Sequence, residues 1–271
     1  MQIVDIIQII CASIIGGGVV TLATYLAERL GSKVGGVIGG FPSTLLVTAL
    51  FLIYGRDAEF AVSALGYIPA SLAVYGITIL SYYFLSKDSF LKGVIGSFSL
   101  WLLGVLILRS LIPFSISSSI ISFILCFLIA RCGIGYFGDS DFFKGEKVRY
   151  TFKQLFIRGL FSGLVVGLCV FLSKIAGPEM SGIFAAFPVA TYSTFTIANY
   201  ARGLSFARAL ALPFIVAGMW NSSVFAIVVH FTLIPLGVTL SVLLGLGASL
   251  LTAYLCLRHL ANTERKIKYK A

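Results

Sequence analysis

Two related stretches decide how this chain is organised: Gly-Gly-Val-Ile-Gly-Gly-Phe-Pro-Ser-Thr at residues 35–44 and Ser-Gly-Ile-Phe-Ala-Ala-Phe-Pro-Val-Ala at residues 181–190. In each stretch, small residues four positions apart precede a Phe-Pro pair, and the two prolines are 146 positions apart. Shifting the sequence by this interval matches residues 17–61 to residues 163–207 without a gap, with 14 identities in 45 positions. The sequence therefore predicts an internal duplication.

The composition places the chain in a membrane. Its 271 residues are 59% hydrophobic and only 11% charged, and the mean hydropathy is +1.03. Apolar runs of the length that crosses a bilayer follow one another almost continuously, which excludes a soluble globular fold. We predict an all-α polytopic membrane protein with nine transmembrane helices, at residues 4–27, 34–54, 60–85, 90–111, 115–134, 152–174, 180–200, 205–231 and 234–258.

The basic residues give a second estimate of the number of spans, because cytoplasmic loops of membrane proteins retain Lys and Arg. With nine spans, seventeen of the twenty basic residues share one side, and only Arg56, Arg109 and Lys174 lie on the other. We therefore expect a cell-membrane protein with its N-terminus outside and its C-terminus in the cytoplasm. The net charge of +10 follows from this topology and favours anionic lipid headgroups rather than nucleic acid as a partner.

The duplication and the span count together predict an inverted repeat. Five spans separate equivalent helices, so these helices cross the membrane in opposite directions. We expect one unit of four helices in residues 1–112, a linking helix and cytoplasmic loop in 113–150, a second unit of four helices in 151–260, and a basic cytoplasmic tail in 261–271. Inverted repeats are typical of secondary transporters, although a duplication can also stabilise a membrane scaffold.

Pro42 and Pro188 predict an interruption in the second helix of each unit, because proline has no backbone N–H and its ring clashes with the preceding turn. The carbonyl groups near residues 38 and 184 then lose their usual helical partners. Paired interruptions at matching places of two halves indicate a substrate site near the bilayer midplane. A kink with only a packing role is the alternative, and the small residues before each proline favour close helix packing.

Polar side chains after the prolines extend the candidate site. The second copy is the more polar, with six hydroxyl or amide side chains between residues 191 and 199. Tyr75 and Thr78 in the third predicted helix offer donors at similar depth, with hydrogen bonds between helices as the alternative role. The candidate residues of a transport path or binding site are Phe41, Pro42, Ser43, Thr44, Phe187, Pro188, Thr191, Ser193, Thr194, Asn199 and Asn221.

No catalytic residues, metal or cofactor are expected. The five cysteines contain no C-x-x-C pair, and the two histidines have no carboxylates at ligand spacing. An enzyme would have to use the acidic cluster Asp139, Asp141 and Glu146, which is typical of a solvated loop. No carboxylate is predicted near the midplane, which favours a neutral or weakly polar solute over a strongly coupled ion.

The pattern of small residues, Phe-Pro, a Ser/Thr-rich helix and Tyr-x-Arg resembles GlpM and related small inner-membrane proteins of prokaryotes. The resemblance covers residues 30–80 and 176–226 and rests on Phe41-Pro42 and Phe187-Pro188 with the small residues before them. Each half would correspond to one GlpM-sized unit, and this chain departs from the family by its duplication and its extra central helix. The resemblance implies an integral inner-membrane protein, linked in some members to cell-surface polysaccharide production, without catalytic residues to carry over.

Two functions therefore stay open. The first is a transporter or permease of a small polar or weakly polar solute, or of a lipid-linked metabolite, by alternating access about the inverted repeat. The alternative is a non-transporting scaffold or accessory subunit for cell-envelope or polysaccharide biosynthesis, with the basic segments 144–158 and 258–270 as docking surfaces. The expected partners are the lipid bilayer and a small solute, and the sequence also allows a homo-oligomer.

Overall fold

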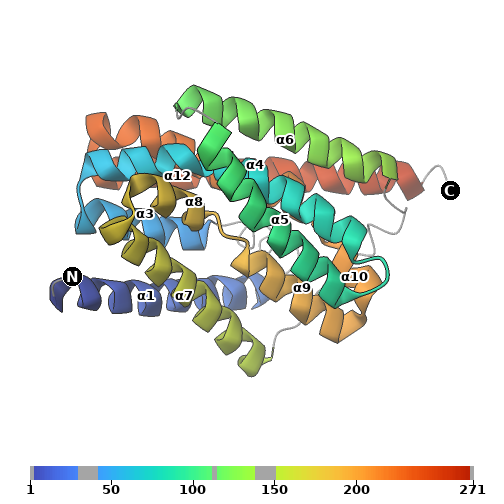
Figure 1. Cartoon of the computed structure of the whole chain (residues 1–271). Coiled ribbons are helices and arrows are strands. Elements are labelled where there is room, and N and C mark those ends of the chain that lie inside the picture. Colours follow the sequence, from blue (N-terminus) through green and yellow to red (C-terminus); the bar gives the residue numbers. More distant parts are fainter. Residues whose placement is uncertain (1–2, 30–41, 112–114, 138–150, 269–271) are drawn as a thin grey trace.

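The computed structural model describes residues 3–29, 42–111, 115–137 and 151–268, and these residues form helices without a strand. The first part of the chain forms α1 (Ile3–Arg29), α3 (Ser43–Gly55), α4 (Ala58–Leu85), α5 (Phe90–Leu111) and α6 (Ile116–Phe137). The second part forms α7 (Phe152–Ile175), α8 (Gly177–Ala185), α9 (Val189–Arg202), α10 (Leu204–Ala209), α11 (Ala211–Pro213), the π-helix η1 (Phe214–Gly218) and α12 (Met219–Lys268). Figure 1 shows the N- and C-terminal ends at opposite ends of the bundle.

The helices have the length and composition of membrane spans. Seven helical stretches in the described part of the chain are long and apolar enough to cross a bilayer. The last of them, Leu204–Cys256, has 53 residues, and a straight helix of that length would extend about 80 Å. It is divided at Gly237, whose φ of 72° is not helical. The fold is therefore that of a polytopic helical membrane protein.

The predicted number of nine spans is not established. The span expected at 34–54 corresponds to α3, which has only 13 residues, and the residues before Pro42 lie outside the described part. The span expected at 180–200 is divided between α8 and α9. The other boundaries agree closely with prediction for α1, α4, α5, α6 and α7.

One predicted span is wrong in form. Residues 205–231 were expected to make a continuous helix, but they contain α10, α11, the π-helix η1 and the beginning of α12. Pro213 lies at the junction, and a proline inside a helix removes a backbone N–H from the hydrogen-bond ladder. The ladder continues with the wider turn of a π-helix at residues 214–218, a feature often found near functional sites.

The core is organised around α4, which contacts α5, α6, α8 and α12. It carries buried side chains from Ala61 to Tyr83, with Leu65, Ile79 and Tyr82 at most 1% exposed. By contrast, α6 and the second part of α12 expose large apolar side chains such as Leu125, Ile129 and Leu251. A protein in a bilayer needs such exposed apolar side chains around a packed interior, because lipid tails cannot hydrogen-bond.

α1 and α7 approach each other along a row of small residues. A Cβ added to Gly17 would lie 2.6 Å from the carbonyl oxygen of Gly159, and one added to Gly163 would overlap the carbonyl oxygen of Ser13. Rising residue numbers on α1 meet falling numbers on α7, so the two helices are antiparallel. Small residues allow such backbone contact between membrane helices. We call this contact the α1–α7 seam, formed by Ser13, Gly17, Thr21, Gly159, Gly163 and Gly167.

Candidate functional site

The helix break between α8 and α9 is confirmed at Pro188. The carbonyl of Phe184 lacks the usual helical donor four residues later, as predicted, because that residue is Pro188, and it accepts instead from the backbone N–H of Phe187 at 3.0 Å. The neighbouring carbonyl of Ile183 accepts one from the hydroxyl of Ser71 on α4 at 2.8 Å. These two carbonyls before the break are thus satisfied by protein atoms, as the membrane interior demands.

The chain around Pro42 has a matching feature. α3 begins at Ser43 directly after Pro42, as α9 begins at Val189 directly after Pro188. Neither helix start has a side-chain cap. In Figure 1, α3 and α9 begin near the middle of the molecule and run towards opposite ends. Pro42 is buried and Ser43 and Thr44 are half-buried, whereas the candidate residue Phe41 lies outside the described residues.

Hydroxyl groups on α9 bind three neighbouring helices. The hydroxyls of Thr191 and Tyr75 are 2.8 Å apart, and both side chains are buried. The hydroxyl of Tyr192 lies 2.9 Å from that of Ser97 on α5.

The third contact is with α7. The guanidinium of Arg158 donates to the hydroxyl of Thr194, which itself donates to the carbonyl of Ala190. The polar run predicted as a path therefore forms the hydrogen bonds between α9 and α4, α5 and α7, and its hydroxyls meet in the protein interior.

The aromatic candidate Phe187 packs against Trp101 of α5, with ring centroids 4.8 Å apart and nearly perpendicular. Trp101 is fully buried and also contacts Phe184 edge-on at 5.5 Å. The residues before the break are therefore held by aromatic contacts with α5, which the local sequence around Pro188 did not reveal.

The remaining candidates are more dispersed. The hydroxyl of Ser193 donates to the carbonyl of Ala190 in its own helix. Asn199 is half-buried near the end of α9, and its backbone carbonyl accepts from the N–H of Gly203. Asn221 is fully buried on α12. The structure therefore brings Phe187, Thr191 and Thr194 into contact with other helices, while Ser193 hydrogen-bonds only within α9.

Sequence reasoning missed several polar residues at this site, among them Ser71, Ser97 and Arg158. Ser71 had no local signal, because nothing in its neighbourhood marks it as the partner of a carbonyl 112 positions away. Arg158 had one: it lies inside the apolar stretch 152–174, and an ionisable residue within a span commonly has a functional role. The charge distribution alone groups Arg158 with the basic residues of the cytoplasmic side and gives it no other role.

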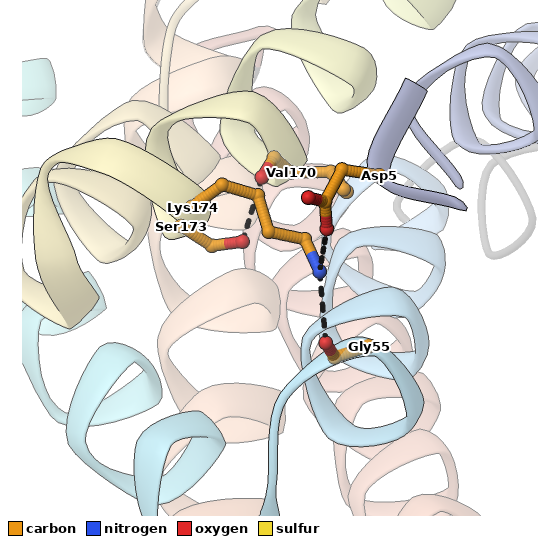
Figure 2. A network of polar contacts seen from close by, with 5 residues as sticks. All are labelled: Asp5, Gly55, Val170, Ser173 and Lys174. Atoms are coloured by element: carbon orange, nitrogen blue, oxygen red, sulfur yellow. Dashed lines mark hydrogen bonds and ion pairs between the residues drawn. The ribbon is translucent and has the colours of Figure 1, made fainter. Parts of the chain in front are cut away.

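A second polar cluster lies at one end of the molecule and joins three helices (Figure 2). The ammonium of Lys174, in the last turn of α7, lies 3.1 Å from the carboxylate of Asp5 in the first turn of α1. It also donates to the carbonyl of Gly55, the last residue of α3, at 3.0 Å. The Lys174 and Asp5 side chains are 10% and 24% exposed.

Among the described residues, no three His, Cys, Asp or Glu side chains gather as metal ligands. All five cysteines are free thiols. The acidic cluster Asp139, Asp141 and Glu146 lies outside the described residues.

Comparison with known proteins gives one family match. Residues 9–118 are similar to the family described as "Protein of unknown function (DUF3147)". The match extends from α1 to the first residues of α6. No curated protein and no solved structure matches the chain. The resemblance to GlpM-like proteins stays a prediction, since the matched family carries no functional description.

Proposed function

We propose that this chain is a membrane transporter or permease that moves a small polar or weakly polar solute, or a lipid-linked metabolite, by alternating access between two inverted units. The first unit would comprise α1 to α5, and the second α7 to α12, with α6 as the link. The observation that carries the proposal is the antiparallel contact of α1 with α7, because these two helices are equivalent in the duplicated sequence.

The α1–α7 seam has the symmetry expected of an inverted repeat. Gly17 and Gly163 are 146 positions apart, and they face each other across the seam. The contact of Ser13 with Gly167 has a counterpart in the contact of Thr21 with Gly159, and the 146-residue shift exchanges the two pairs. A two-fold axis between Gly17 and Gly163 accounts for both contacts, and such an axis is the basis of rocking-type alternating access.

A second pair of equivalent helices follows the same rule. Residues 62, 76 and 83 follow one another along α4, and they contact residues 230, 219 and 208 of the second unit. The numbers rise on one side and fall on the other, so the two segments are antiparallel. The carbonyl of Val62 lies 2.8 Å from Nδ1 of His230, and a Cβ on Gly76 would meet Met219. Near the end of α4, the carbonyl of Tyr83 accepts from Nε of Arg208 at 3.2 Å. This second antiparallel pairing supports the same axis independently of the seam.

The helix boundaries also favour two units. The starts of α3 and α9 are 146 residues apart, and so are the starts of α4 and α10. The family match over residues 9–118 covers most of the proposed first unit and ends before the second begins. A match of this extent is what an unduplicated relative of one unit would give.

A topology of nine spans is part of the proposal. The start of α1, the end of α3 and the end of α7 meet at one end of the molecule through Asp5, Gly55 and Lys174. Nine spans require these three ends to share a side, if α3 and the residues before it make one crossing. We infer from the distribution of basic residues that this side is external and that the C-terminus is cytoplasmic.

The proposed substrate site lies where α3 and α9 begin, close to the Tyr75–Thr191 hydroxyl pair. We propose no catalytic chemistry and no cofactor, and lipid headgroups rather than nucleic acid as partners of the basic segments. A solute that binds there has to displace hydrogen bonds between α9 and its neighbours. If the solute replaces these hydrogen bonds better in one conformation than in the other, its binding favours that conformation.

The test is a thermal-shift screen of the purified protein against small metabolites and lipid precursors, followed by flux into proteoliposomes for each ligand found. A ligand that binds only the folded state raises its apparent stability by mass action. We expect Thr191→Val combined with Thr194→Val to abolish both the shift and the flux.

The matched control is Thr196→Val, since the hydroxyl of Thr196 donates only to the carbonyl of Tyr192 in its own helix. It should retain both signals. Unchanged flux in the Thr191/Thr194 variant would show that these hydroxyls of α9 do not line the transport path. The absence of any ligand across the panel would favour the alternative, a scaffold for envelope biosynthesis, and binding partners would then be sought with the basic segments 144–158 and 258–270.

A further inference from the structure

The contact of Lys174 with Asp5 and Gly55 joins the two proposed units. Asp5 and Gly55 belong to the first unit, on α1 and α3, and Lys174 belongs to the second, on α7. Figure 2 shows the ammonium between the carboxylate on one side and the end of α3 on the other. We name the set Asp5, Gly55 and Lys174 the latch.

The chemistry of the latch is favourable for each partner. Gly55 ends α3, so its carbonyl has no donor from a following turn, and it lies at the negative end of the helix dipole. An ammonium there satisfies the carbonyl and is itself neutralised by Asp5. Hydrogen bonds to a charged group are stronger than neutral ones, and the 10% exposure of the Lys174 side chain limits competition from water.

The packing around the latch leaves little free space. A Cβ on Gly55 would lie 3.2 Å from the side-chain oxygen of Gln8, so α1 lies directly against the end of α3. One turn before the latch, Val170 packs in a buried cluster with Val47 of α3, and Cys169 is fully buried. α7 therefore has a closed contact with the first unit at this end.

The opposite end has a different contact between the units. The guanidinium of Arg208 donates to the carbonyl of Tyr83 and lies over its ring, 4.6 Å from the centroid. Tyr83 is 28 residues beyond Gly55, most of them in α4, which places the two contacts about 40 Å apart along the helix. The units are thus joined by a cation and a backbone carbonyl near each end of α4.

We propose that the latch holds the two units closed at the α1 end and that its release opens the protein there. The inference rests on the proposed function in one respect, namely that the two units move relative to each other. Opening at one end while the Arg208–Tyr83 contact holds the other is the asymmetry that alternating access needs. Because Lys174 is a single side chain with two partners on the other unit, its removal breaks the contact without disturbing the seam.

The test uses the native thiol of Cys169 as a reporter. The other four cysteines are replaced by serine, and the rate of labelling by a membrane-impermeant maleimide is measured in vesicles and in proteoliposomes of both orientations. We expect slow labelling of the parent. Lys174→Met removes both contacts of the ammonium and should raise the rate at least about tenfold, since one hydrogen bond to a charged group already contributes about 1.5 kcal/mol or more, which corresponds to that factor. The rise should occur only with maleimide added on the side of the membrane where α1 begins.

Asp5→Asn is the second variant, because it keeps the shape of the carboxylate and removes its charge, and it should raise the rate less than Lys174→Met. Arg208→Met is the control at the opposite end and should leave the labelling of Cys169 at the parent rate. Gel filtration and circular dichroism confirm that each variant is folded before it is compared.

Parent-like labelling of Cys169 in both Lys174→Met and Asp5→Asn would overturn the latch. So would an equal rise in Arg208→Met, since that would mean general loosening. The measurement needs no substrate and no flux. If the Lys174 and Asp5 variants label faster but no solute is transported, the latch is supported and the transport proposal fails. If solute is transported but labelling of Cys169 is unchanged, the transport proposal is supported and the latch fails.

Discussion

The α1–α7 seam allows a sharp test of the packing on which the proposed inverted arrangement depends. Substituting alanine for Gly163 adds one Cβ, which would overlap the backbone carbonyl of Ser13, and the Gly17→Ala substitution places a Cβ 2.6 Å from the carbonyl of Gly159. Backbone atoms cannot rotate away, so the two helices must move apart. Overpacking of this kind costs about 1–3 kcal/mol.

The matched control is Gly18→Ala, on the same helix, where a Cβ would meet nothing within 4 Å. Alanine is favoured over glycine in a helix by about 1 kcal/mol, and this gain is common to all three variants. The difference from Gly18→Ala therefore isolates the clash. At about 2–4 °C per kcal/mol for a large domain, Gly17→Ala and Gly163→Ala should unfold about 2–12 °C below Gly18→Ala.

The assay is thermal unfolding of the detergent-solubilised variants, followed by the reactivity of buried thiols and by loss of the monodisperse peak in gel filtration. The two seam variants should move in the same direction, with Gly163→Ala the less stable, since its added carbon makes the tighter contact. If both were as stable as Gly18→Ala, the helices would not meet at these glycines and the proposed axis would lose its main support.

Three further predictions concern topology and the site. Single cysteines at Arg56 and Arg202 should be labelled from opposite sides of the membrane, and labelling from one side would end the inverted-repeat proposal. Tyr75→Phe should destabilise the fold by about 1–3 kcal/mol in chemical unfolding, because it leaves the buried hydroxyl of Thr191 without its partner. An unchanged denaturant midpoint would mean that the Tyr75–Thr191 hydrogen bond does not contribute to stability. Pro188→Ala should alter ligand binding or flux more than folded yield, and a loss of yield alone would make the break purely structural.

Part of the fold could be read directly from the sequence because its causes are local. Apolar runs of the right length form helices in a bilayer, since each helix satisfies its own backbone groups. The ends of α4, α5 and α7 accordingly lie within two residues of the predicted ends. Pro188 interrupts its helix for a reason confined to its own residue, and α3 starts directly after Pro42.

Other breaks in the helices are harder to predict from the sequence. Pro213 signalled a defect, but proline alone does not specify whether the chain kinks, stops or widens into the π-helix that occupies residues 214–218. Gly237 could be suspected from its neighbour Pro235, yet its positive φ depends on how the two parts of α12 pack. Such choices follow from the neighbouring helices rather than from the residue itself.

The sequence by itself determined the apolar helices of membrane-spanning length and the proline break, because hydropathy, helix length and the missing N–H of proline act within a few residues. Only the tertiary structure decided that Thr191 meets Tyr75, that Lys174 joins Asp5 to the end of α3, and that Gly17 faces Gly163. These partners are more than a hundred residues apart, and a hydroxyl, an ammonium or a glycine accepts many neighbours equally well. Which neighbour it has depends on how whole helices pack, and that is a property of the folded chain.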